Sequence, residues 1–322
     1  MLNRKWVTRY SHTGVCYRVW EAPVPAIEPS LLNCVFYLYP TLNSAKKREQ
    51  IGGTGFFVTI PLETNKAWLQ VYAVTNRHCV VKAGDKLVLR INKAGGLLDF
   101  VETKTSDWIQ HPILYDVAVL PFDLSPDHKV QAVATNHFLL TQNWAANVGI
   151  GPGDDVFMVG RFISQDGRQQ NLPAVRFGNI ARMNSEPIQD EYGIKQDSFL
   201  VEMRSISGFS GSPVFVFINP MLARPPHWWT KGITVYSQFQ HGPWLLGIDW
   251  GHVPTFHSVL SANREDAVDP PEWVQANSGM AAVIPAWRLQ EILDLPELVM
   301  QRTKDDERIT EMKKQNSTIV ND

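Results

Sequence analysis

The chain has 322 residues, of which 44% are hydrophobic, and a formal net charge of −2 at neutral pH. This length is enough to bury a sizeable core. The nearly balanced charge, without a basic tract, argues against a nucleic-acid partner. The first residues contain no apolar core of signal-peptide length and no later run approaches membrane-spanning length, so we expect neither export by that route nor a membrane partner.

Three cysteines are present, Cys16, Cys34 and Cys79, and an odd number cannot pair completely within one molecule. They are also too scattered along the chain to form a zinc site. Such sparse cysteine usage is typical of a reducing compartment. We therefore expect a cytoplasmic protein without a structural disulfide, a bound metal or another cofactor.

Short apolar runs follow one another along the chain, with Gly, Pro or Asn between them. They lie at residues 32–39, 55–60, 68–74, 87–91, 117–122, 156–162, 199–203, 214–218, 233–236 and 245–250. Short runs with little helical periodicity predict an all-β, antiparallel protein. Near the end, residues 285–295 have apolar side chains at helical spacing and predict a C-terminal helix.

The stretch Ser-Ile-Ser-Gly-Phe-Ser-Gly-Ser-Pro-Val at residues 205–214 places one hydroxyl, that of Ser210, between glycines just before an apolar run. Gly208 has no Cβ, so it can adopt a positive φ and let its N–H converge with that of Ser210. The pattern predicts a nucleophile beside an oxyanion hole formed by Gly208 and Ser210. The alternative is an ordinary Gly/Ser/Pro turn.

A serine nucleophile needs a base and a carboxylate that orients the base. His78 directly follows an apolar strand, and Asp116 opens the apolar run 117–120. Taken singly, each position is more often structural than catalytic. Among competing acids, Asp99 and Asp107 lack a following apolar run, and Asp123 comes after its strand has ended.

The order of the three residues along the chain is His78, Asp116, Ser210. An α/β-hydrolase needs Gly-x-Ser-x-Gly and the order Ser, acid, His, whereas here Ser212 occupies the last glycine position. The ordered set instead resembles the trypsin-like (chymotrypsin-fold) serine peptidases, especially their high-temperature-requirement branch, over roughly residues 30–295. The matching landmarks are Thr54–Val58, Val74–His78, Asp116–Leu120, Gly208–Pro213, Leu246–Asp249 and Ala281–Pro285.

The resemblance implies a fold of two antiparallel six-stranded β-barrels around a shared cleft. Barrel one is expected at about 30–135 and barrel two at about 145–285, with the glycine-rich segment 149–154 entering the second. This division places His78 and Asp116 on one barrel and Ser210 on the other. Residues 1–29 are expected to form an extension packed on the body, and residues 296–322 a loose polar tail.

The resemblance also implies a mechanism, serine endopeptidase action on a peptide or protein substrate through an acyl-enzyme. His78 would take the proton of Ser210, and Asp116 would hold the imidazole tautomer. Substrate would lie extended along the strand from Gly247 to Gly251. Its binding residues would be Arg204, Ser205, Gly247, Asp249, Trp250 and Gly251.

Arg204 and Asp249 would set the preference for the residue before the cut. If the two pair with each other, the pocket is neutral overall and favours a small or apolar side chain, and this is the expectation we adopt. If Arg204 alone faces the pocket, an acidic side chain is favoured. In a third arrangement, one or both point away into surface ion pairs.

Three departures from relatives stand out. Phe209 occupies the place of the aspartate that secreted digestive relatives engage after activation, so activation by N-terminal cleavage is not expected. Cys79 stands where secreted relatives often have a disulfide, but the stretch Gly52–Gly55 supplies no partner cysteine. The residues beyond the barrels are too few for the PDZ domain that many relatives of the stress-protease branch carry.

A function from another class is a peptide-binding pseudoprotease or scaffold that uses the same fold without cleavage. Its usual signature is the loss of a triad residue, whereas this chain keeps His78, Asp116 and Ser210. Hydrolysis of acyl esters by the same serine would be a side activity of the peptidase rather than a separate function.

If no disulfide supports the fold, a thiol reductant should change neither the melting temperature nor the activity of the protein. Differential scanning calorimetry with and without dithiothreitol measures this. A clear fall of the melting temperature in dithiothreitol would contradict the expectation.

Overall fold

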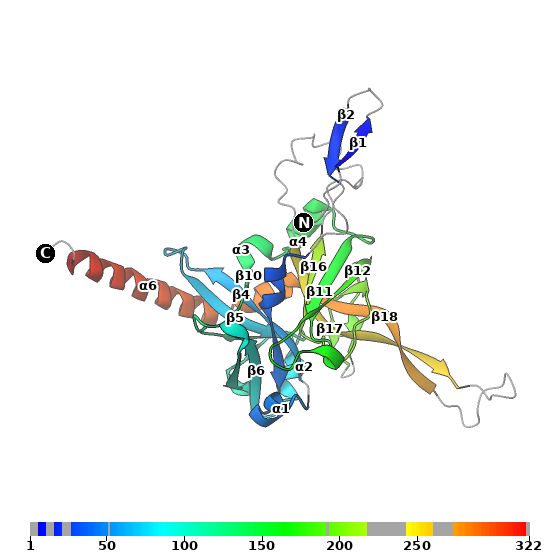
Figure 1. The fold of residues 1–322 in the computed structure, drawn as a ribbon, viewed down its shortest axis with the longest axis horizontal. Helices are drawn as coiled ribbons and strands as arrows, with labels where there is room; N and C mark the ends of the chain where they lie inside the picture. The colour runs from blue at the N-terminus through cyan, green and yellow to red at the C-terminus, as the bar shows by residue number, and fades with distance from the viewer. Residues whose placement is uncertain are drawn as a thin grey trace.

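The structure is a computed structural model that describes residues 6–10, 16–20, 27–50, 52–190, 193–217, 243–259 and 273–319. The described chain contains two main β-sheets that lie against each other, and its longest helix is at the C-terminal end (Figure 1). A separate two-stranded sheet pairs β1 (Trp6–Tyr10) with β2 (Cys16–Trp20).

The first sheet has eight strands in the order β7-β6-β3-β4-β5-β9-β8, with β10 paired to β4. Its strands are β3 (Val35–Tyr39), β4 (Gly53–Pro61), β5 (Leu69–Thr75), β6 (Lys86–Asn92), β7 (Leu98–Lys104), β8 (Ile109–Gln110), β9 (Ala118–Pro121) and β10 (Val133–Ala134). The β10–β4 pair is parallel and the other pairs are antiparallel. The 3₁₀ helix Pro29–Cys34 precedes β3, α1 (Leu42–Lys47) connects β3 to β4, and α2 (Arg77–Val81) connects β5 to β6.

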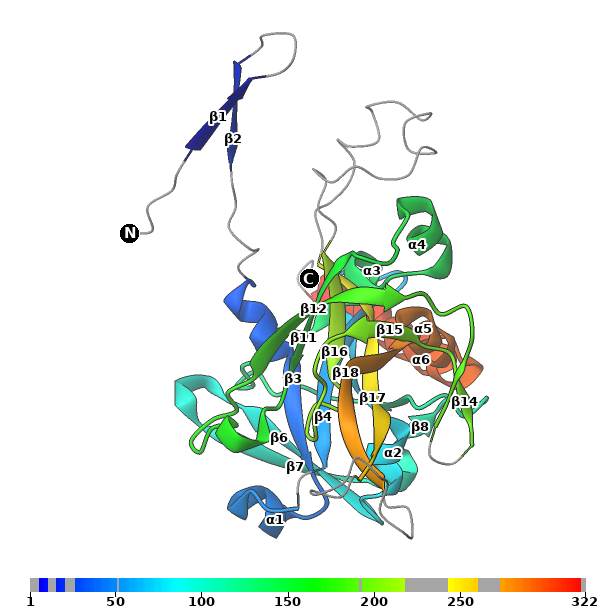
Figure 2. The same ribbon diagram turned by 90° about the vertical axis from the view of Figure 1, so that its right-hand side faces the viewer.

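The second sheet closes into a six-stranded barrel, in the order β11-β12-β15-β18-β17-β16. Its strands are β11 (Asp155–Gly160), β12 (Ala174–Arg182), β15 (Phe199–Glu202), β16 (Pro213–Phe217), β17 (Trp244–Ser258) and β18 (Trp273–Pro285). The short strands β13 (Ile188–Gln189) and β14 (Lys195–Gln196) pair beside it, and α3 (Thr135–Phe138) and α4 (Gln142–Val148) precede it. Figure 2 shows the second barrel beside the first sheet.

Strand β4 is apolar on both faces because each face packs into a different core. Phe57 lies in a core enclosed by the first sheet, whereas its neighbours Phe56 and Val58 lie in a larger core shared with the second barrel. Alternate side chains of a strand point to opposite faces, so an unbroken apolar run satisfies both cores at once.

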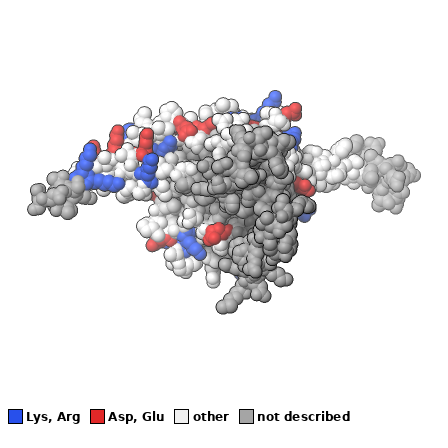
Figure 3. All heavy atoms as spheres, turned by 90° about the horizontal axis from the view of Figure 1, so that it is seen from above, with Lys and Arg blue, Asp and Glu red and all other residues white. Residues whose placement is uncertain are grey.

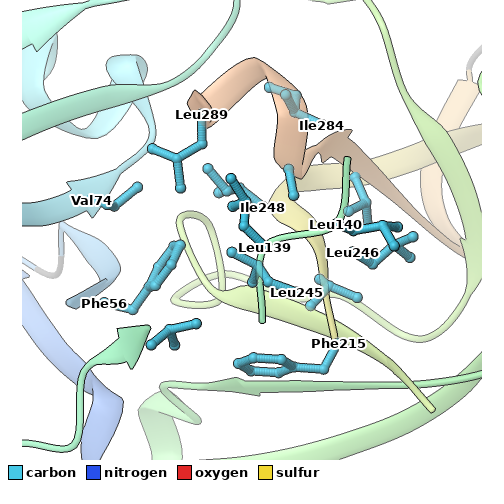
Figure 4. Packing of buried hydrophobic residues seen from close by; sticks show 14 of the residues in the cluster. Phe56, Val74, Leu139, Leu140, Phe215, Leu245, Leu246, Ile248, Ile284 and Leu289 are labelled. Atoms are coloured by element: carbon cyan, nitrogen blue, oxygen red, sulfur yellow. The ribbon is translucent and has the colours of Figure 1, made fainter. Parts of the chain in front are cut away.

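The shared core fixes the two sheets relative to each other. Phe56 and Val74 of the first sheet pack in one cluster with Phe215 and Ile248 of the barrel (Figure 4). Leu289 of α5 (Ala286–Leu293) closes the same cluster. The apolar face of α5 is buried against the strands, as the helical spacing at residues 285–295 predicts.

The structure confirms the predicted mostly-β, chymotrypsin-like fold with a C-terminal helix, with one difference in detail. Only the second sheet is a closed six-stranded barrel in the described chain; the first is an open, eight-stranded half-barrel. The strands β7 and β12 were not predicted, because one face of each is exposed and polar residues interrupt the apolar run. The predicted run at 233–236 lies outside the described residues.

Residues 296–322 were expected to form a loose polar tail, but the described part of this segment is a docked helix. The helix is α6 (Pro296–Ile319), which is anchored where the Asp306 carboxylate accepts hydrogen bonds from the backbone N–H groups of Thr64 (2.7 Å) and Asn65 (3.0 Å). Leu298 and Ile309 of the helix are buried. This docking could not be predicted from the sequence, because the residues that Asp306 contacts lie more than 240 positions away in the chain.

On the face drawn in Figure 3, the described Lys and Arg side chains alternate with Asp and Glu. None of the helices that the structure describes combines the length and apolar composition needed to cross a membrane.

Candidate active site

His78 and Asp116 meet because of how the chain turns after β5. The strand ends at Thr75, and His78 occupies the first turn of α2. Its ring Nδ1 lies 2.5 Å from Asp116 Oδ2, and its backbone N–H donates to Asp116 Oδ1 over 2.7 Å. The carboxylate therefore holds both the ring and the backbone of His78.

Two further residues hold Asp116 in this position. The side-chain amide of Asn76 donates to the Asp116 carbonyl oxygen (2.8 Å), and the Asp116 N–H donates to Gln196 Oε1 in β14 (3.0 Å). Asp116 is only 7% exposed. Because buried polar groups are costly when unpaired, these bonds keep the carboxylate oriented toward His78.

Burial by itself lowers the pKa of His78, since an apolar environment disfavours the charged ring. The contacts of the ring with the Cys79 sulfur and with the Asp116 carboxylate outweigh burial and raise the pKa of His78 above its ordinary value. The Asp116 carboxylate, 2.5 Å from Nδ1, carries the negative charge of the pair. It therefore stabilises the His78 ring in its protonated, imidazolium form.

The loop that carries Ser210 depends on two glycines. Gly208 has a φ of +98° and Gly211 a φ of +86°, a region that residues with a Cβ rarely adopt. A Cβ at Gly208 would lie 2.7 Å from Ile163 Cγ1, and one at Gly211 would lie 2.1 Å from the Thr54 carbonyl oxygen. Both positions therefore require glycine for conformation and for space.

The Ser210 loop is attached to the first sheet through Thr54. The Thr54 N–H donates to the Ser210 carbonyl oxygen (2.9 Å), and its hydroxyl donates to the Gly208 carbonyl oxygen (2.6 Å). The same hydroxyl accepts from the Arg161 N–H (3.1 Å). Thr54 lies within a landmark of the sequence, but its role depends on contacts with residues more than 100 positions away and was not predicted.

Ser210 and His78 line one groove but form no hydrogen bond with each other, although both are fully described. The imidazole Nε2 instead lies 3.5 Å from Cys79 Sγ, and this thiol is 4.0 Å from the Ser210 carbonyl oxygen. Cys79 is a free, buried thiol. A Cβ at Gly53 would lie 2.9 Å from its sulfur, so glycine stands opposite the thiol at the point where a partner cysteine could have been.

A groove of about 580 Å³ brings most of the predicted site residues together. Its lining includes His78, Asp116, Ser205, Ser210, Trp250 and Gly251. A second groove of about 470 Å³ shares His78 and Ser210 and is lined by Gly208, Gly53 and Cys79. The two grooves meet at His78 and Ser210. Gly247 lies deeper, packed in β17 against the Ile284 carbonyl.

Arg204 and Asp249 do not form the ion pair that the sequence suggested; among the described residues Arg204 is exposed and Asp249 is fully buried. Burial raises the pKa of Asp249 to about 7, although the Ser205 hydroxyl donates to its Oδ2 over 2.8 Å. Its Oδ1 has no hydrogen-bond partner. Trp250, next in β17, donates its indole N–H to the Ser198 hydroxyl (2.9 Å).

The described side chains contain no group of three or more His, Cys, Asp or Glu that could hold a metal ion. The chemistry available at the junction of the grooves is that of a hydroxyl, an imidazole and a carboxylate, with the Cys79 thiol beside the imidazole.

Residues 53–216, about half of the chain, match the model of the trypsin-like peptidase domain family. The chain belongs to the trypsin-like peptidase family. This confirms the family that the sequence landmarks indicated, and it supports serine-type peptidase function in general. A search of curated proteins finds no match.

Solved structures similar to this chain include several proteases. One is Deg5, with 14% sequence identity and a TM-score of 0.40; the match covers 69% of this chain and 81% of that one. Another is the HtrA-type protease AlgW with a decapeptide, with 14% identity and a TM-score of 0.42; the match covers 83% of this chain and 66% of that one. A third is an inactive form of Rv3671c from M. tuberculosis H37Rv, with 15% identity and a TM-score of 0.41; the match covers 84% of this chain and 94% of that one.

The contact between His78 and Asp116 predicts a raised histidine pKa that can be measured without any activity. In ¹⁵N-histidine NMR spectra of the Ser210→Ala protein, His78 should titrate above its ordinary value of 6.5. Asp116→Asn should lower that midpoint, because burial then acts without the carboxylate. Asp127→Asn, which removes an exposed carboxylate, is the matched control. Equal midpoints with and without Asp116 would contradict the assignment.

Proposed function

We propose that this trypsin-like protein is a serine endopeptidase in which Ser210 is the nucleophile, His78 the general base and Asp116 the orienting carboxylate. The observation that carries the proposal is the 2.5 Å contact of His78 Nδ1 with Asp116 Oδ2 on the wall of the groove that also contains Ser210. It leaves Nε2 as the ring nitrogen available to accept a proton.

The reaction begins when Ser210 Oγ attacks the carbonyl carbon of the scissile peptide bond and His78 Nε2 takes the hydroxyl proton. Because Asp116 accepts a hydrogen bond from Nδ1–H, it fixes the tautomer and stabilises the imidazolium that forms. The negative charge that develops on the substrate oxygen is received by the N–H groups of Gly208 and Ser210. Loss of one such donor costs about 3 kcal/mol in the barrier.

Collapse of the tetrahedral intermediate breaks the C–N bond, and His78 returns its proton to the leaving amine. The acyl group stays on Ser210 Oγ as an ester. A water molecule then attacks this ester with His78 again acting as base, which releases the carboxylic acid product and regenerates the hydroxyl of Ser210.

One adjustment must precede the attack, because the Ser210 hydroxyl is not hydrogen-bonded to His78 and Nε2 faces Cys79. Rotation of the serine side chain toward Nε2 would replace the weak contact to sulfur with a hydrogen bond between nitrogen and oxygen. Catalytic hydrogen bonds of this kind commonly tighten only when substrate binds.

The same observation favours the second candidate function, a peptide-binding protein that does not cleave. If His78 stays directed at Cys79, the groove can hold an extended peptide without activating Ser210. Cleavage assays separate the two functions, since the scaffold requires binding without turnover.

Replacement of single residues tests the proposal. Ser210→Ala should abolish cleavage of unfolded β-casein at an unchanged melting temperature, because its hydroxyl borders an open groove. His78→Ala should abolish cleavage as well. The double variant should be no worse than either single one, since the two residues act as a unit. Ser185→Ala, at an exposed serine outside both grooves, is the control. Turnover above a trace by purified Ser210→Ala would reject the nucleophile.

A further inference from the structure

Strands β17 and β18 continue past the barrel as a two-stranded arm, formed by residues 252–258 and 273–279 (Figure 1). Its pairing runs from Pro254 opposite Asn277 to Ser258 opposite Trp273. The arm begins directly after Trp250 and Gly251, which line the groove containing Ser210.

One face of the arm continues this groove. Pro254, Phe256 and Gln275 line the same groove as His78 and Ser210. Phe256 pairs with Gln275 in the register, and residues two positions apart in a strand share a face. Asn277, on this face, donates its side-chain amide to the Ser205 carbonyl oxygen over 2.5 Å.

The face carries two large aromatic side chains that are not buried. Phe256 is 59% exposed and Trp273 is 64% exposed. Trp273 lies opposite Ser258, so the two aromatic residues are diagonal neighbours on one face, a spacing at which aromatic side chains reach each other. Exposed apolar area that continues a binding groove is typical of a surface that a partner covers.

The backbone of the arm also has an open edge. Strand β16 pairs with β17 only from Trp244 to Ile248, and β18 occupies the other edge of β17. From Trp250 onward, no other described strand pairs with the β16 side of β17. Such an edge accepts an extended peptide as an added strand, with backbone hydrogen bonds giving affinity and side-chain contacts giving selectivity.

We propose that the arm is a remote binding surface for the part of the substrate upstream of the cut, where Phe256 and Trp273 hold a large apolar side chain that lies several residues before the scissile bond. This inference rests on the proposed function, because it assigns the upstream direction from attack by Ser210. The second groove, past Gly208 and Cys79, takes the downstream residues.

The length of the arm sets how far upstream of the cut the contact can extend. Residues 250–258 extend for about 30 Å at roughly 3.4 Å per residue, so an added strand contributes roughly eight residues upstream of the cut. It runs antiparallel to β17, since its C-terminal end must reach Ser210.

The first measurement uses peptides based on a cleavage site mapped in unfolded β-casein. A six-residue core peptide is compared with versions extended by eight residues at the N-terminal side, with either Phe or Ser in the extension, and with a version extended at the C-terminal side. The Phe-containing N-terminal extension should lower KM about tenfold or more, because burial of one large apolar side chain can supply that factor. The Ser version should gain less.

The second measurement compares variants on the two faces of the arm. Phe256→Ala should remove most of the gain from the N-terminal extension, measured within each variant as the ratio of kcat/KM for the extended peptide to kcat/KM for the core peptide. Val274→Ala is the matched control, because Val274 is also apolar and exposed but pairs with His257 on the opposite face. Binding of the fluorescein-labelled extended peptide to the Ser210→Ala protein should follow the same pattern.

The proposal is overturned if the N-terminal extension brings no gain, if only the C-terminal extension does, or if Phe256→Ala and Val274→Ala are equally affected. Each of these results leaves cleavage of the core peptide, and with it the proposed function, intact. Absence of cleavage with normal binding of the extended peptide to the wild type would instead reject the peptidase and retain the arm as a binding surface.

Discussion

The hydrogen bonds of Thr54 are the constraint on which the rest of the site depends, because the base and the nucleophile belong to different sheets. Thr54 extends from the first sheet and bonds to the carbonyl groups of Gly208 and Ser210 in the second. Its side chain is completely buried, and its own carbonyl oxygen accepts from the Thr75 hydroxyl (2.8 Å). Water cannot replace these partners there, so leaving one of them unpaired costs about 1–3 kcal/mol.

The Ser210 loop is supported from beneath by a buried charged cluster. Arg161, fully buried, donates to the Asp166 carboxylate and to the Tyr39 hydroxyl, and its guanidinium lies over the rings of Tyr37 and Tyr39. Removing one partner of such a pair is strongly destabilising, because it leaves a buried charge uncompensated. The cluster joins the end of β11, which Arg161 follows, to β3, which carries the two tyrosines. Ile163 lies between Arg161 and Asp166 in the chain and packs against Gly208.

Features with local signals could be predicted from the sequence. The glycines around Ser210 and the apolar runs beside His78 and Asp116 identify the fold and the three residues that the structure brings to one groove. The positive φ of Gly208 follows from the same local reasoning.

Features that depend on distant partners could not be predicted. Gln196 supports Asp116 across 80 residues, and the docking of α6 through Asp306 spans 241, so no local pattern marks either one. Arg204 and Asp249 have opposite charges, which suggested an ion pair. In the structure the Ser205 hydroxyl donates to one oxygen of the buried Asp249 carboxylate, and Arg204 lies at the surface. The extension of β17 and β18 beyond the barrel was not predicted, because polar residues interrupt the apolar run that would indicate a strand.

The central claim is that Ser210 is a nucleophile activated by His78. The most direct measurement is the mass-spectrometric identification of the residue that a fluorophosphonate probe modifies in the native protein. The expected result is one adduct, on Ser210, which is lost in His78→Ala and after unfolding in urea. Modification of another residue, or no modification of the folded protein, would contradict it.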